Sequence, residues 1–117
     1  MVRLGMVTFD SVDAVALASW WAQRLGGTVV NDNDGWFCTV TAPGLPLTLG
    51  FQKVDDPTPG KNRAHLDLDA GDTDRATAVE SFVAAGATRV DQHTIGGFTW
   101  EVLADPDGNL FCIGDPH

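Results

Sequence analysis

The sequence contains few basic residues and no long apolar run. Lysine and arginine make up only 7 of its 117 residues against 16 aspartates and glutamates, which gives a formal net charge of -9 at pH 7. A surface of that sign repels phosphate backbones and anionic lipids, so we expect neither nucleic acid nor a membrane as a partner. No window approaches about 18 consecutive apolar residues, and residues 1–10 lack the basic and apolar parts of a secretory signal. We therefore expect a cytoplasmic protein whose partner is a small neutral or cationic molecule.

Cysteines and common catalytic motifs are also scarce. Cys38 and Cys112 each lie in an apolar, strand-like run, which is poor material for a disulfide framework, and we expect two free thiols. There is no GxGxxG, GxxxxGK or CxxC motif, and no serine stands in a nucleophile elbow. The hydrophobic fraction of 44% is enough for one domain that folds alone.

Turn-forming residues divide the chain into two halves with the same order of elements. In the first half a helix follows Asp13 and ends at Gly26, and in the second half a helix follows Asp72 and ends at Gly86. Alternating apolar patterns predict the strands. They lie at 2–9, 28–31, 36–41, 45–54, 64–69, 88–92, 98–104 and 109–113.

The two halves match each other position by position. Met6 corresponds to His65, and Trp36 and Cys38 correspond to Phe98 and Trp100 at a slightly longer offset. An ordered series of such pairs indicates a duplicated unit. The sequence predicts an α+β fold with two tandem βαβββ modules in a single domain. The predicted parts are module one at 1–54, a linker at 55–62 and module two at 63–117.

Three segments resemble the vicinal oxygen chelate superfamily, which contains glyoxalase I, the bleomycin-resistance proteins and the extradiol dioxygenases. They are DAVALASWWAQRLG from Asp13, HLDL from His65 and WEVLADPDGNLFC from Trp100. The last segment is similar to the glyoxalase-like subgroup that is common in actinobacteria. The resemblance implies an eight-stranded, open, barrel-like curved sheet with the helices outside and a ligand site in its cup.

Metal-using members of this superfamily take two ligands from each module, one near the start of its first strand and one in its last strand. On this sequence the four places fall at Met6, about Gly50, His65 and Cys112. A thioether is a weak donor and glycine has no side chain, so two good donors are too few to hold a catalytic metal firmly. We therefore expect neither a metal nor another cofactor. The side chains that could add a donor are Gln52, Asp67 and Glu101.

The candidate ligand contacts lie on the strands that would line the cup. Alternation places His65 and Asp67 on one face of their strand, and the repeat adds Met6 and Thr8 from the first strand. His65 is either a ligand contact or a relic histidine that is hydrogen-bonded to Asp67 or to the backbone. Cys112 is either a site residue or a small buried filler.

The strand at 98–104 has an aromatic face and a polar face, and either can line the cup. If the polar face does, Glu101 is a carboxylate partner for a cation; if the aromatic face does, Trp100 is a stacking surface, with plain core packing as its alternative. The candidate site has no catalytic residue and no metal ligand. Its ligand-binding residues are Met6, Thr8, His65, Asp67, Trp100, Glu101 and Cys112.

The expected function is metal-free binding that sequesters a small neutral or cationic, aromatic molecule, in the manner of the drug-binding resistance proteins. The alternative is a lyase or isomerase of glyoxalase type with an altered metal site around His65 and Cys112. A third possibility is a module that serves protein contact. Helical spacing lets only one of Trp20 and Trp21 face a sheet, so we expect the other to cover a module interface or a dimer contact. A homodimer is mildly preferred, since a second copy can complete the cup.

Overall fold

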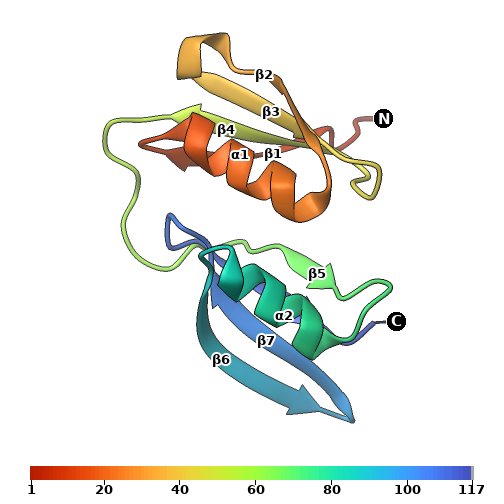
Figure 1. The fold of residues 1–117 in the computed structure, drawn as a ribbon. Coiled ribbons are helices and arrows are strands. Elements are labelled where there is room, and N and C mark those ends of the chain that lie inside the picture. The colour runs from red at the N-terminus through yellow and green to blue at the C-terminus, as the bar shows by residue number, and fades with distance from the viewer. Residues whose placement is uncertain (117) are drawn as a thin grey trace. The chain divides into compact units, whose positions relative to one another are not determined.

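The computed structural model describes residues 1–116 and divides into two compact units, Met1–Pro59 and Gly60–His117. The boundary lies within the predicted linker at 55–62. Each unit contains one helix and one four-stranded mixed sheet, which confirms the two-module α+β fold (Figure 1). The eight strands of the described residues form two sheets of four rather than one sheet of eight.

Unit 1 is a βαβββ module with the strand order β1-β4-β3-β2. The pair β1 and β4 is parallel, and the other pairs are antiparallel. Its elements are β1 (Met6–Ser11), α1 (Ala14–Leu25), β2 (Thr28–Asn31), the 3-10 turn η1 (Asn33–Gly35), β3 (Phe37–Thr41) and β4 (Thr48–Lys53).

Unit 2 repeats this topology with the strand order β5-β8-β7-β6. The pair β5 and β8 is parallel, and the other pairs are antiparallel. Its elements are β5 (Asp67–Asp69), α2 (Arg75–Ala84), β6 (Thr88–Ile95), β7 (Phe98–Ala104) and β8 (Leu110–Gly114).

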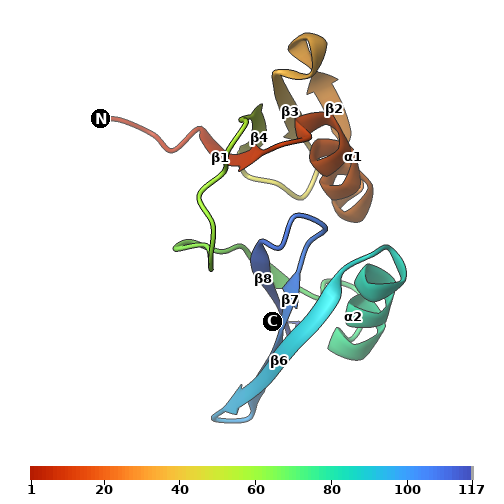
Figure 2. The ribbon, with the colours of Figure 1, turned by 90° about the vertical axis from the view of Figure 1, so that its left-hand side faces the viewer.

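The core of each unit lies between its helix and one face of its sheet, as Figures 1 and 2 show. In unit 1, Leu17 and Trp21 of α1 are 2% and 1% exposed, and β4, which α1 contacts, contributes the buried Phe51. In unit 2, the ring of Phe82 on α2 contacts the buried Phe111 on β8 at 5.5 Å between centroids. Burial of these apolar side chains is the main force that holds each helix on its sheet.

The helix ends follow capping chemistry, with one correction to the sequence prediction. Asp13 caps α1 by accepting from the backbone N–H of Ala16, and Gly26 ends the helix in the left-handed conformation, both as predicted. The predicted cap Asp72 is wrong, because Asp74 caps α2 and accepts from the Thr77 N–H at 2.7 Å. That hydrogen bond lowers the pKa of the Asp74 carboxyl.

The tryptophan pair on α1 divides between core and surface. Trp21 is buried, whereas Trp20 is half-buried and meets the Trp21 ring edge-to-face at 5.0 Å. The interface role of Trp20 stays a prediction. Both cysteines are buried free thiols, as expected, and no helix within residues 1–116 has the length and apolar character needed to span a bilayer.

The strand registers correct one predicted match between the modules. Phe51 on β4 pairs with Cys38, and its counterpart Ile113 on β8 pairs with Glu101. Cys38 therefore corresponds to Glu101 and not to Trp100. The turns before β3 and β7 differ, because η1 precedes one strand and a turn at Gly96 and Gly97 precedes the other. The resulting slip of one residue exchanges the two faces of the strand, since alternate side chains point to opposite sides.

Candidate functional site

A pocket of about 680 Å³ lies on the sheet of unit 2 and is lined entirely by residues of that unit. This volume is in the range that small-molecule sites occupy. The lining side chains of β7 and β8 alternate with residues such as Leu103 and Phe111, which are buried. Because Phe111 contacts α2, the pocket is on the face of the sheet that points away from the helix.

The aromatic face of β7, and not its polar face, lines this pocket. Phe98 and Trp100 are lining residues, and their ring centroids are 6.2 Å apart. Glu101 is half-buried and alternates to the side of the sheet that carries Leu103, so it is absent from the pocket lining. The structure thus brings Trp100 into the candidate site and leaves Glu101 on the opposite face.

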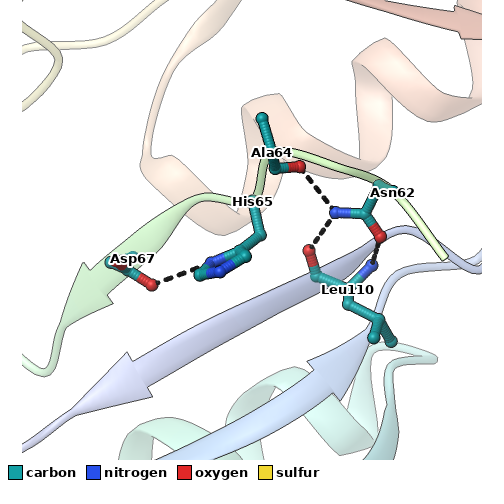
Figure 3. Close-up of polar contacts among 5 residues, drawn as sticks. All are labelled: Asn62, Ala64, His65, Asp67 and Leu110. Atoms are coloured by element: carbon teal, nitrogen blue, oxygen red, sulfur yellow. Dashed lines mark hydrogen bonds and ion pairs between the residues drawn. The ribbon is translucent and has the colours of Figure 1, made fainter.

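Three predicted site residues, His65, Asp67 and Cys112, meet at the β5 side of the pocket, and Figure 3 shows the first two of them. The Nδ1 atom of His65 donates a hydrogen bond to Oδ1 of Asp67 at 3.1 Å. Asp67 is directly paired with Cys112 across the parallel strands β5 and β8. One donor atom from each of the three side chains lies within 4.8 Å of the others. His65 therefore has the Asp67 contact that the sequence suggested, and it also faces the pocket.

The Cys112 thiol is protonated at neutral pH. The residue is 8% exposed, and burial together with the negative charge of Asp67 and a hydrogen bond to it raises the thiol pKa to about 11. A nucleophilic cysteine needs the opposite environment, one that stabilises the thiolate. Cys112 therefore lines the pocket as a neutral thiol beside Asp67.

Asn62 holds the chain segment that carries His65, and sequence reasoning did not identify it. Its side-chain amide donates to the carbonyls of Ala64 at 2.7 Å and Leu110 at 2.9 Å, and its Oδ1 accepts from the Leu110 N–H at 2.8 Å (Figure 3). These bonds fasten the segment before β5 to the start of β8. No local pattern signals them, because the partner strand is 48 residues away.

His93 was also missed, and here the sequence did contain a signal. The predicted strand at 88–92 stops one residue before His93, whereas β6 continues to Ile95. The His93 ring lies against Trp100 with centroids 5.3 Å apart, and its Nε2 atom is 3.3 Å from Oδ2 of Asp91. Extending the alternation of this strand past Gln92 places His93 beside the aromatic face of β7.

Met6 and Thr8 gather in unit 1, around Gly50. A Cβ atom at position 50 would be 2.8 Å from Sδ of Met6 and 2.8 Å from Oγ1 of Thr8. The registers make these three residues the counterparts of His65, Asp67 and Cys112. The predicted association of Met6 and Thr8 on one strand face is present, but neither residue lines the pocket of unit 2.

Two βαβββ modules, each with its helix on one face of a four-stranded mixed sheet, have the architecture that the vicinal oxygen chelate superfamily implies. The family model for the glyoxalase-like domain matches residues 6–114 of the sequence. The chain belongs to this glyoxalase-like family. A search of curated proteins gives no match.

Several solved structures share this fold. A glyoxalase/bleomycin resistance protein/dioxygenase family enzyme from Burkholderia phytofirmans PsJN is 22% identical with a TM-score of 0.77, covering 97% of this chain and 98% of that one. A glyoxalase-related enzyme from Fulvimarina pelagi is 21% identical with a TM-score of 0.76, covering 97% and 88%. The lactoylglutathione lyase from Agrobacterium tumefaciens is 16% identical with a TM-score of 0.71, covering 96% and 92%. At these identities the likeness shows the fold alone.

Among residues 1–116, the donors that could hold a metal ion gather in unit 2, where two of the four superfamily positions, His65 and Cys112, are joined by Asp67. His65, Asp67 and Cys112 are imidazole, carboxylate and thiol donors of the kinds that zinc accepts, and three such donors leave a coordination position open. In unit 1, the equivalent places hold Met6 and Gly50, and a donor at position 50 would crowd its neighbours. A metal ion held by this chain would therefore depend on the three donors of unit 2.

Proposed function

We propose that this chain binds and sequesters a small neutral or cationic, aromatic molecule in the pocket of unit 2, without a metal. One observation carries the proposal: a single pocket combines the rings of Phe98 and Trp100 with the carboxylates of Asp67 and Asp69. Aromatic faces attract flat rings and cations, and carboxylates attract cations. Two aromatic rings and two carboxylates thus face one space.

The charge around the pocket supports a neutral or cationic ligand. Lys61 is the one lysine or arginine among the described lining residues, against two aspartates. The net charge of -9 over the whole chain adds a long-range attraction for cations.

The chemistry of the lining groups supports binding rather than turnover. The Cys112 thiol is protonated, which is the unreactive form of a cysteine, whereas the hydrogen bond of His65 Nδ1 to Asp67 leaves the Nε2 atom for a contact with the ligand. Sequestration requires only that the pocket exclude water from the ligand's ring and neutralise its charge. Both are ground-state interactions, which give affinity without a reaction.

The test is calorimetric titration with two probes, the 1-methylquinolinium cation and neutral quinoline. Replacing Trp100 with Leu removes the stacking face, and we expect a loss of about 0.5 to 2 kcal/mol for the cation, which is roughly twofold to thirtyfold in Kd. The matched control is Trp36→Leu, because Trp36 is 58% exposed in unit 1 and lies outside the pocket. The proposal is contradicted if neither probe binds, or if the Trp100→Leu variant binds the cation as tightly as the parent chain does.

The three-donor cluster favours a second candidate, a lyase or isomerase of glyoxalase type. His65, Asp67 and Cys112 would hold a divalent metal, which when bound supplies Lewis-acid polarisation of a substrate oxygen. In that role the raised thiol pKa opposes metal uptake, since Cys112 must first lose its proton.

Metal titration separates the two candidates. Under metal-free binding, we expect zinc to leave the melting temperature nearly unchanged and to show no stoichiometric uptake. A large rise in melting temperature at one zinc per chain, lost in the Cys112→Ser and His65→Ala variants, would instead establish the second candidate.

A further inference from the structure

The strand registers place a carboxylate and two ring systems of the pocket in one row across the sheet of unit 2. Asp69 on β5 is paired with Gly114 on β8, Gly114 with Trp100 on β7, and Trp100 with His93 on β6. All four residues line the pocket. Neighbouring strands are about 4.8 Å apart, so Asp69 and Trp100 are separated by two spacings, or roughly 10 Å.

The middle of the row is a flat apolar surface. Gly114 has no side chain, and the ring of Phe98 covers its place, because a Cβ atom there would be 2.7 Å from Phe98 Cζ. No charged group stands between Asp69 and Trp100 in this row. An extended apolar chain can therefore lie across β8 from one end to the other.

The two ends of the row have different chemistry. At one end the His93, Trp100 and Phe98 rings form an aromatic ledge, with neighbouring centroids 5.3 Å and 6.2 Å apart. At the other end the exposed Asp69 carboxylate accepts from the Gly71 N–H at 2.6 Å, and Asp67 is next along the same face of β5.

From this arrangement we infer that the pocket selects two-ended molecules, in which an aryl group is joined through a flexible apolar spacer to an ammonium group. The ring stacks on the aromatic ledge, the spacer crosses Gly114 and Phe98, and the ammonium group pairs with Asp69. This inference rests on the proposed function and narrows the class of ligand. A cation whose charge lies within its ring would contact only the aromatic ledge and would not reach Asp69.

Four probes test the spacing by calorimetric titration of the whole chain. They are naphthalene carrying a hexylammonium chain, naphthalene carrying an ethylammonium chain, naphthalene carrying an uncharged hexanol chain, and hexylammonium without a ring. We expect the naphthyl-hexylammonium to bind most tightly. Its advantage over the hexanol probe is set by one exposed ion pair, about 0.2 to 1 kcal/mol, or roughly a factor of up to five.

Replacing Asp69 with Asn isolates the charged end. Asn retains an oxygen that accepts from the Gly71 N–H, so the local turn is kept while the charge is removed. We expect this variant to lose the advantage of the naphthyl-hexylammonium and to bind the hexanol probe unchanged. Asp72→Asn is the matched control, since Asp72 is exposed, outside the pocket lining and of the same charge.

The outcomes distinguish a failure of the proposed function from a failure of the two-ended selection. If no naphthyl probe binds, the proposed function fails. If the naphthyl probes bind equally whatever their chain length and charge, or if Asp69→Asn behaves like Asp72→Asn, the two-ended selection alone is overturned.

Discussion

At the scale of single residues, the protonation state of Cys112 bears on whether the pocket of unit 2 can hold a metal ion. Its position in the last strand is one where the superfamily places a metal ligand, and its environment keeps the thiol protonated. Burial is the first cause, and the neighbouring Asp67 carboxylate adds to it. The same aspartate that completes the three-donor cluster therefore also opposes the thiolate that a metal would need.

The raised pKa of Cys112 predicts how stability depends on pH. The pKa is about 11 in the folded chain and 9.0 ordinarily, so the folded state holds the proton more tightly. The contribution of the protonated thiol is fully present below pH 9 and is lost as the pH rises through 11, because the unfolded chain ionises first. Urea unfolding of Cys112→Ser over this range should show a shallower decline than the parent chain. An identical decline in the two proteins contradicts the assignment.

At the scale of elements, the sequence predicted the presence and order of both helices and all eight strands, because apolar periodicity and turn residues are local signals. It failed where the decision depends on partners distant in the chain. The slip that exchanged the faces of β7 is visible only in the pairing of Glu101 with Ile113. Similarly, the choice of Asp74 over Asp72 as a cap depends on which aspartate reaches the Thr77 N–H.

The cap of α2 can be tested directly. Replacing Asp74 with Ala removes the acceptor for the Thr77 N–H, and we expect a loss of about 0.5 to 2 kcal/mol in the free energy of unfolding. Asp72→Ala is the control and should change stability by less than about 0.5 kcal/mol, as surface substitutions usually do. Equal losses in denaturant unfolding would show that both aspartates contribute to the helix start.

At the scale of the whole molecule, the duplication and the net charge are the features that follow most directly from the sequence. The repeat led to the superfamily, and the family match over residues 6–114 confirmed it. Four of the predicted site residues line one pocket, namely His65, Asp67, Trp100 and Cys112, whereas Glu101, Met6 and Thr8 do not, and their role in binding stays a prediction. Alternation in the sequence separates the two faces of a strand, but only the pairing of the strand tells which face lines the pocket.

The acidic character of the chain predicts a salt effect on binding. A net charge of -9 attracts a cationic probe over a distance that shrinks from roughly 30 Å at 0.01 M salt to about 8 Å at 0.15 M. We expect stopped-flow association of 1-methylquinolinium to slow across this range, and that of neutral quinoline to remain constant. Equal salt dependence of the two probes would show that the overall charge plays no part in capture.

The crowded backbone at Gly50 also constrains how this protein can evolve. Any side chain introduced there meets Met6, Thr8 and, at 3.0 Å, the ring of Phe37, so a substitution at this position requires these side chains to move. A new donor at this position is therefore accommodated only together with changes in its neighbours, whereas the equivalent place in unit 2 already holds the Cys112 side chain.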